Sequence, residues 1–227
     1  MSRLAGSPGP HVFVESMGTM QLDEDDLAHL TKSLRMRDGD ALTASDGKGS
    51  WRSARFSPSG KLIADGEIHS VASRDPLVTV AFSLVKGSKP ELVIQKLTEL
   101  GVDRIVVLAA ERSIVKWDEA KAEKALSRWS RISREASMQS HRVRVPLIEA
   151  VVPAVEWLSR PEVSIAHFGG APLTEEQASI AIGPEGGWSD TELAASSSRI
   201  TLGSTVLRAE TAAIAAGTLL TASASRQ

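Results

Sequence analysis

The sequence has 227 residues, of which 42% are hydrophobic and 24% charged, with a formal net charge of −2 and no cysteine. This composition is typical of a folded globular protein, and it excludes disulfide bonds and any site that needs a thiolate. No apolar run approaches the roughly 20 residues needed to cross a bilayer, and residues 1–10 contain no apolar core of a secretion signal. We therefore expect a cytoplasmic protein with no membrane partner.

Residues 1–75 are predicted to be mostly strands, interrupted by one short helix. The strands are expected at residues 11–14, 41–43, 51–56 and 61–71, and the helix at about 25–34. Asp46-Gly47 and Pro58-Ser59-Gly60 stand between apolar runs, which is the pattern of a hairpin turn. The first 75 residues therefore predict a small β-barrel.

After Pro76 strands and helices alternate, which predicts a mainly parallel α/β sheet for residues 76–227. Ser88 with Glu91 and Ser189 with Glu192 have the spacing of a helix capping box. The expected strands are 77–85, 104–109, 163–168, 179–182 and 199–202. The expected helices are 89–100, 118–140, 153–159, 189 onward and 210–222.

The charge is distributed unevenly. Residues 86–146 hold 13 basic and 8 acidic residues, or +5, while residues 1–75 sum to −2 and residues 147–227 to −5. A basic middle predicts one anion-facing surface, although a solvated helix face gives the same pattern.

One side of the long helix carries this charge. Arg128, Arg131, Glu135 and Arg142 share a helix side if the helix persists to residue 142, with Arg134 and Gln139 flanking it, and this predicts a phosphate-binding strip. Trp129 belongs to the opposite, apolar side and is expected in the core.

Three strand ends carry unusual sequences: His167-Phe168-Gly169-Gly170, the run GPEGG at residues 183–187, and LGSTVLRAET at residues 202–211. Ligands of open parallel sheets bind beyond the carboxyl ends of the strands, and glycine lets the backbone approach a ligand closely. Tight turns alone would explain one such pair of glycines. The chain has no phosphate-binding loop motif and no pair of histidines four residues apart, so we expect neither a nucleoside triphosphate nor a metal.

These motifs resemble the RsmE-type 16S rRNA (uracil-N3)-methyltransferases of the SPOUT superfamily. The resemblance runs in order from about residue 11 to 222, and GPEGG together with LRAET is its most specific part. Further matches are His29-Leu30, residues 34–36, 39–40, 95–102 and 111–113, and residues 135–142. The stretch 168–179 is short and departs from the family pattern, so we expect the first loop of the knot to differ from that of the family.

The resemblance implies a PUA-like, RNA-binding β-barrel at residues 1–75 and an α/β domain with a trefoil knot at residues 76–227. It implies S-adenosylmethionine (SAM) as methyl donor, a homodimer, and as target N3 of one uridine in the small-subunit rRNA, position 1498 in the usual count. A SPOUT enzyme that methylates a ribose 2′-OH or another base is the alternative, and a non-catalytic rRNA-binding module is a weaker one.

The resemblance also implies roles for individual residues. Arg208 is the first catalytic candidate, because a cation there could stabilise an anionic uracil oxygen or bind an rRNA phosphate. Glu185 is the second, as proton acceptor or as a contact to the methyl donor. Purely structural roles are the alternatives: Arg208 would pair with Glu210 or Glu185, and the two carboxylates would stabilise helix N-termini. Cofactor-binding residues would be Phe168, Gly169, Ile182, Gly183, Pro184, Glu185, Gly186, Gly187, Leu202, Gly203, Val206, Leu207, Arg208, Glu210 and Thr211. RNA-binding residues would be Arg35, Arg112, Arg128, Arg131, Arg134, Gln139 and Arg142.

Overall fold

The computed structural model describes residues 9–87, 89–115 and 117–225. The chain divides into two compact units: the N-terminal unit runs to Ser73 and includes Arg134–Val145, and the C-terminal unit comprises Arg74–Ser133 and the chain from Pro146 onward. The segment Arg134–Val145 was expected in the C-terminal domain, so its place in the N-terminal unit is a correction. Within the described ranges no helix has the length and apolar character needed to span a membrane.

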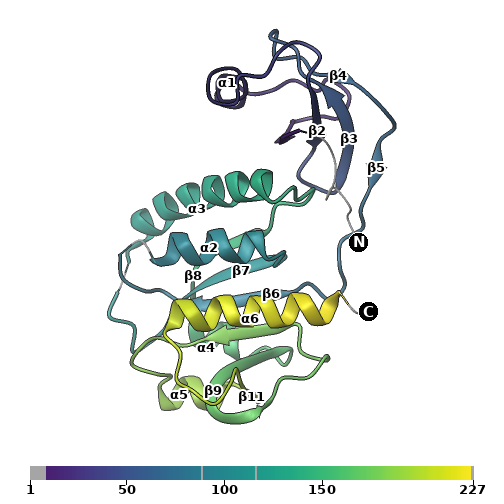
Figure 1. Ribbon diagram of the computed structural model, residues 1–227. Coiled ribbons are helices and arrows are strands. Elements are labelled where there is room, and N and C mark those ends of the chain that lie inside the picture. Colours follow the sequence, from purple (N-terminus) through teal and green to yellow (C-terminus); the bar gives the residue numbers. More distant parts are fainter. Residues whose placement is uncertain (1–8, 88, 116, 226–227) are drawn as a thin grey trace. The chain divides into compact units, whose positions relative to one another are not determined.

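The N-terminal unit is built on a five-stranded sheet (Figure 1). Its strands are β1 (His11–Phe13), β2 (Ala41–Ser45), β3 (Ser50–Arg55), β4 (Ile63–Ala64) and β5 (His69–Ser70), ordered β1-β2-β3-β4 with β5 beside β3. The predicted turn at Asp46 joins β2 and β3 as an antiparallel hairpin. The Asp23 side chain accepts the Asp26 N–H and so caps helix α1 (Glu24–Ala28), which continues into a π-helical turn, η1 (His29–Ser33).

The long strand predicted for residues 61–71 is wrong. The structure has only the two-residue strands β4 and β5 there, both exposed. Gly66 lies between them with φ +127°, a left-handed conformation that interrupts an extended strand. The chain therefore bends away from β3 between two short pairings.

The segment Arg134–Val145 is integral to the N-terminal unit. Met138 packs on the core formed by residues such as Leu30 and Phe56. The Val143 carbonyl accepts hydrogen bonds from the Ser45 hydroxyl at 3.0 Å and the Gly49 N–H at 3.0 Å. This segment supplies both core and backbone partners to the first sheet.

The C-terminal unit contains a six-stranded sheet of order β11-β9-β10-β6-β7-β8, and all its pairs are parallel, as predicted. The strands are β6 (Thr79–Ser83), β7 (Arg104–Ala109), β8 (Leu147–Pro153), β9 (Val163–Pro172), β10 (Ser179–Ile182) and β11 (Ser198–Thr201). The helices are α2 (Lys89–Glu99), α3 (Glu119–Gln139), α4 (Ala154–Leu158), α5 (Asp190–Ala195) and α6 (Ala209–Ala224).

Helices cover both faces of this sheet, because its central strands are apolar on both sides. Val80 and Phe82 of β6 pack in one core with residues of α2, α6 and Trp129 of α3. Ala81 packs in a second core with Trp157 of α4. Trp129 is 1% exposed, so its predicted place in the core is confirmed.

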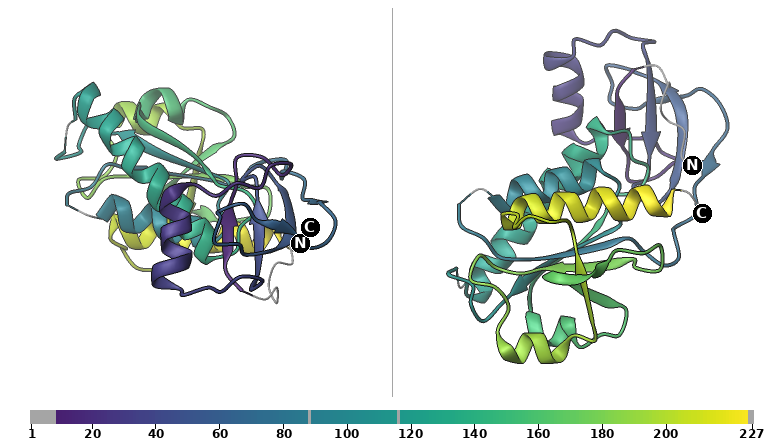
Figure 2. Two further views of the ribbon diagram at one scale, coloured as in Figure 1. Left: turned by 90° about the horizontal axis from the view of Figure 1, so that it is seen from above. Right: turned by 60° about the horizontal axis from the view of Figure 1, so that its bottom comes forward.

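Helix α6 follows the edge strand β11 but returns to pack beside α2, on β6 and β10 (Figure 2). Gly217 permits this close approach, since a Cβ there would lie 2.6 Å from Leu97 Cδ2. The small residues of α6 are therefore used within the protomer.

Helix boundaries follow capping chemistry. The Asp118 side chain accepts the Lys121 N–H at 2.8 Å and begins α3, and Ser189 with Glu192 forms the predicted capping box of α5. The box predicted at Ser88 lies outside the described residues. Helix α3 ends at Gln139, one residue from its predicted end, and His141 has φ +55°. The condition that would place Arg142 on the same helix side is therefore not met.

The sequence pattern also missed β8. This strand is half-exposed at the sheet edge and is interrupted at Val151, which has φ +50°. It therefore lacks both the continuous apolar run of a buried strand and a regular alternation.

Candidate functional site

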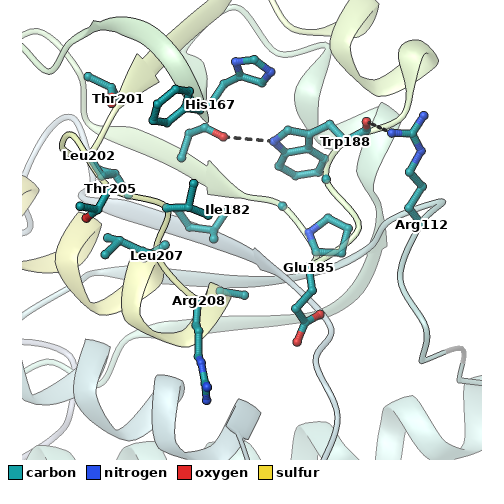
Figure 3. A pocket seen from close by; sticks show the side chains of 18 of the residues that line it. Arg112, His167, Ile182, Glu185, Trp188, Thr201, Leu202, Thr205, Leu207 and Arg208 are labelled. Carbon is teal, nitrogen blue, oxygen red and sulfur yellow. Dashed lines mark hydrogen bonds between the residues drawn. The ribbon is translucent and has the colours of Figure 1, made fainter.

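A cavity of about 650 Å³ lies at the carboxyl ends of β9, β10 and β11 (Figure 3). The predicted glycine-dense segments form most of its wall, and α5 and the loop after β7 complete it. The lining consists of residues 112, 166–168, 182–185, 187–188, 190, 193, 201–203, 205–209 and 212. The cavity lies entirely within the C-terminal unit.

Trp188 forms one wall. It is only 5% exposed, and its indole N–H donates to the Ala166 carbonyl of β9 at 3.3 Å (Figure 3). A Cβ on Gly183 would lie 3.0 Å from the indole ring, so glycine at 183 allows the ring to pack against the end of β10. Trp188 therefore packs against the end of β10 and also lines the cavity.

Two glycines leave the cavity wall open. Gly187 has φ +72° and its N–H closes a turn onto the Pro184 carbonyl at 2.9 Å, and Gly203 has φ +149°. A Cβ at either position would meet no atom within 4 Å. The backbone at these two points is thus accessible to a ligand.

The cavity combines apolar side chains with accessible backbone groups. Phe168 and Val206 line it and remain 67% and 85% exposed. The carboxylates of Glu185 and Asp190 also belong to the lining. A site of this size with apolar walls, open backbone and a few charges suits a small ligand with a flat ring and a cationic group.

Lys89 connects two of the cavity segments. Its ammonium lies 3.1 Å from a Glu210 carboxylate oxygen and 3.9 Å from Glu185 Oε1. The backbone N–H of Glu210 itself and then Lys89 hold the pKa of the Glu210 carboxyl below its usual range. Both carboxylates considered as partners of Arg208 form ion pairs with Lys89, and the charge of Arg208 makes a smaller contribution to the lowered pKa of Glu210.

Arg208 is the N-cap residue of α6 and is exposed. Within the part of the chain that the structure describes, its guanidinium has no hydrogen bond or ion pair. In Figure 3 the side chains of Arg208 and Glu185 extend in the same direction, away from Trp188. The cation is therefore available to a substrate anion.

The structure brings together most of the predicted cofactor residues. Eleven line the cavity: Phe168, Ile182, Gly183, Pro184, Glu185, Gly187, Leu202, Gly203, Val206, Leu207 and Arg208. Gly169, Gly186, Glu210 and Thr211 do not line it. A Cβ on Gly186 would meet the Arg112 carbonyl at 3.3 Å, so a larger residue there would press on the loop after β7 before it filled the cavity.

Several lining residues were not predicted, among them His167, Thr205, Asp190 and Leu193. His167 and Thr205 stand inside the segments singled out by their glycines. Asp190 and Leu193 belong to α5, and the capping box directly after Gly187 was the signal that placed this helix beside the turn.

Three of the predicted RNA contacts lie in the C-terminal unit. Arg112 lines the cavity and donates to the Trp188 carbonyl at 2.9 Å. Arg128 is exposed and lies 3.4 Å from Glu91, and Arg131 is exposed on α3. Arg112, predicted as an RNA contact, is therefore a residue of the cavity wall.

The other four belong to the N-terminal unit. Arg35 is exposed with φ +54°, and Gln139 is the exposed last residue of α3. Arg134 is half-buried and hydrogen-bonds to Asp26 and Asp23, and Arg142 follows the end of the helix. The guanidinium of Arg134 is thus engaged within the protein.

Comparison with known families decides the class of the protein. The family model of an RNA methyltransferase domain matches residues 73–221, and that of an RNA methyltransferase PUA domain matches residues 22–68. The chain belongs to this RNA methyltransferase family. The two matches make it an α/β methyltransferase domain preceded by a PUA domain.

Relatives of this RNA methyltransferase align over most of their length. The chain is 30% identical to ribosomal RNA small subunit methyltransferase E of Mycobacterium bovis, covering 86% of this chain and 83% of that protein. A Legionella pneumophila methyltransferase solved with bound SAM is 27% identical with a TM-score of 0.78, covering 93% and 96% of the two chains. The Neisseria gonorrhoeae ribosomal RNA small subunit methyltransferase E, also solved with SAM, is 29% identical with a TM-score of 0.75, covering 94% and 97%.

Proposed function

We propose that this protein is a SAM-dependent methyltransferase of 16S rRNA that methylates N3 of a single uridine, position 1498 in the usual count, in the small ribosomal subunit. The observation that carries the proposal is the cavity at the ends of β9, β10 and β11, formed by the glycine segments 183–187 and 202–211. Relatives named ribosomal RNA small subunit methyltransferase E support the substrate class. Two similar structures that were solved with bound SAM support the methyl donor.

The residues present fit SAM. The N–H groups of Gly187 and Gly203 are bonded within the protein, so their carbonyls are the groups that can accept from a polar adenosine or methionine group. Apolar contact to the adenine would come from Phe168, Ile182, Leu202 and Leu207, and Glu185 would offer a carboxylate to the cationic part. When bound, SAM supplies an activated methyl group on a sulfonium.

The protein residues must handle a proton and a charge. The N3–H of uracil is protonated at neutral pH, so methylation at N3 requires loss of that proton and stabilisation of the negative charge on the uracil oxygens. We assign the stabilisation of this charge to the guanidinium of Arg208 and the acceptance of the proton to Glu185, both of which line the cavity. N3 lies on the Watson–Crick edge, so the uridine must be unpaired or flipped out.

We further propose the domain roles. The N-terminal unit, residues 1–73 together with 134–145, is a PUA-like RNA-binding domain, and the C-terminal unit is a SPOUT domain with a trefoil knot. The return of α6 from edge strand β11 to the sheet centre supports such threading. The proposed RNA contacts are Arg128 and Arg131 on α3, Arg35, Gln139 and Arg142 in the N-terminal unit, and Arg112 and Arg134 through any donors not already engaged.

A cytoplasmic homodimer completes the proposal. The homodimer rests on the family resemblance alone. The small residues of α6 do not argue for a second subunit, because they pack against α2 within one protomer. Light scattering at micromolar concentration tests it: twice the mass of 24.2 kDa is expected, and the monomer mass contradicts it.

The test of function has two arms. Calorimetry with SAM separates an enzyme from a non-catalytic rRNA-binding module, which would bind no donor. Incubation with unmethylated small subunits and SAM, followed by nuclease digestion and mass spectrometry, identifies the product. Formation of 3-methyluridine at one position is expected, whereas a 2′-O-methylated nucleoside or another methylated base would replace this proposal by the alternative SPOUT activity.

A further inference from the structure

Glu192 is a buried carboxylate that the proposed reaction does not use. It lies in the first turn of α5 and is 0% exposed. Its Oε2 accepts the Ser189 N–H at 2.8 Å, which completes the capping box. Its Oε1 accepts the backbone N–H of Glu111 at 2.8 Å, from the loop after β7, 81 residues away in sequence.

A helix cap alone does not require the second bond. Capping is satisfied by the Ser189 contact and would leave Oε1 free to meet water. Burying a carboxylate is costly unless each oxygen is hydrogen-bonded, and here the two oxygens are bonded to backbone groups of two different loops. Glu192 thus fastens the loop after β7 to the turn after β10.

The fastened loop continues directly into the cavity. Arg112 follows Glu111, lines the cavity and donates from Nη1 to the Trp188 carbonyl at 2.9 Å (Figure 3). On its other side Ser113, buried, donates from its hydroxyl to the Leu84 carbonyl at 2.8 Å. Residues 111–113 are therefore anchored at both ends, with Arg112 between the anchors.

Trp188 carries this restraint across the cavity. Its carbonyl is held by Arg112, and its indole N–H is bonded to Ala166 of β9. The loop also bears on Gly186, whose Cβ position lies 3.3 Å from the Arg112 carbonyl. A shift of the loop after β7 would therefore move the wall formed by Trp188 and the turn after β10.

We propose that Glu192 is a positioning residue of the SAM cavity, acting through Arg112 on Trp188. This inference rests on the proposed function for the identity of the ligand. Glu192 does not line the cavity itself. Its Oε1, through the bond to the Glu111 N–H, fixes the loop that shapes the cavity wall.

The decisive variant is Glu192→Gln. The glutamine amide has a single oxygen acceptor, whereas the Ser189 and Glu111 N–H groups each donate to a separate oxygen of Glu192. Calorimetric SAM affinity is expected to fall about tenfold, since one buried N–H loses its partner. The matched control is Ser189→Ala, which removes the bond from the Glu192 N–H to the Ser189 hydroxyl and leaves both hydrogen bonds of the Glu192 carboxylate in place. It should lower the melting temperature but keep SAM affinity within about twofold.

A double-mutant cycle with Arg112→Ala separates positioning from a general loss of stability. If Glu192 acts through Arg112, the two losses of SAM affinity are not additive, and Glu192→Gln costs little once Arg112 is truncated. A purely structural role predicts additive losses. Kinetically, the KM for SAM should rise more than the KM for the small subunit.

The outcomes are distinguishable. A wild-type protein that binds no SAM contradicts the proposed function itself. If the wild-type protein binds SAM and Glu192→Gln binds it equally tightly, only the positioning role is overturned. The same holds if the losses of SAM affinity in Glu192→Gln and Arg112→Ala are additive. If Glu192→Gln does not fold, Glu192→Asp replaces it, since a carboxylate one methylene shorter does not span to both amides, and unchanged SAM affinity in that variant is equally decisive against the proposal.

Discussion

Arg134 donates to both carboxylate oxygens of Asp26, one of them at 3.0 Å from Nη1, and Asp26 is 6% exposed. The same guanidinium lies 5.5 Å from the centre of the Phe13 ring. Asp26 belongs to α1 and Arg134 to α3. This ion pair, 108 residues apart in sequence, therefore holds the segment Arg134–Val145 to the rest of the N-terminal unit.

Breaking this pair should destabilise the protein. Asp26→Asn removes the buried carboxylate and leaves the half-buried guanidinium paired with the exposed Asp23 at 3.1 Å. The free energy of unfolding should fall by about 2 kcal/mol, because a partly buried charge that loses its buried partner is costly. Urea unfolding measures the loss. Asp25→Asn changes the same charge on the exposed side of α1 and should stay within about 0.5 kcal/mol of wild type; equal losses in the two variants would count against a structural role of the pair.

The exposed arginines of α3 should bind rRNA phosphate. The double variant Arg128→Ala/Arg131→Ala should bind small-subunit rRNA more weakly, and the log–log slope of affinity against salt should flatten by about 0.7–0.9 for each lost phosphate contact. SAM affinity should not change, because neither residue lines the cavity.

Lys121→Ala/Lys124→Ala is the matched control, since it removes the same charge from an earlier part of the helix. If both double variants lower affinity and slope equally, the effect comes from net charge and not from contacts at residues 128 and 131.

Gly203 should be needed for donor binding because its backbone is open to the cavity. Gly203→Ala places a methyl group where no protein atom lies within 4 Å and strains a backbone with φ +149°. We expect SAM affinity to fall about tenfold, with a stability loss of about 1–3 kcal/mol. Gly39→Ala also has positive φ and open surroundings, but lies in the N-terminal unit. It should lose stability with SAM affinity intact, and calorimetry on the two folded variants checks the contrast.

Stability should fall in mild acid because of His11. Burial, and then the neighbouring His141 ring stacked at 5.8 Å, lower the pKa of His11 from 6.5 to about 4. The Arg142 carbonyl can only accept, so Nε2 of His11 carries the proton and Nδ1 accepts from the Thr43 hydroxyl at 2.8 Å. The neutral ring is thus the form that the fold requires.

The sign follows from proton uptake. Between pH 6.5 and 4 the unfolded chain binds a proton that the folded chain does not, so this contribution is present above pH 6.5 and is lost as pH falls. From pH 7 to 5 the loss is about 2 kcal/mol. His11→Gln does not titrate and should lose less stability over that interval in urea unfolding; His69→Gln, at an exposed ring, serves as control. Parallel curves for wild type and His11→Gln would show that another group causes the acid sensitivity.

The sequence was most informative where one local rule decides the structure. Continuous apolar runs located β6 and β10, Asp118 located the start of α3, and the Ser189–Glu192 spacing located α5. The cavity followed from a topological rule, since glycine-dense strand ends of a parallel sheet meet at one edge.

What the sequence did not show depends on long-range partners. Nothing near Arg134 in the sequence distinguishes it from Arg131, because its partner Asp26 lies in another element. The second bond of Glu192 has the same character, since the capping spacing is local and the bond to Glu111 is not. The edge strand β8 escaped because half-exposed strands carry little periodicity.

The late segment Arg134–Val145 has a consequence for any attempt to divide the protein. A fragment ending near residue 75 would lack Met138 in its core. It would also lack the Val143 carbonyl, which accepts from the Ser45 hydroxyl and the Gly49 N–H, and Arg134, the partner of Asp26. Such a fragment would expose apolar surface and an unpaired buried carboxylate. A polypeptide of the RNA-binding part alone would therefore need residues 134–145 spliced back onto it, and the ribosome must synthesise more than half of the chain before the first unit can complete its fold.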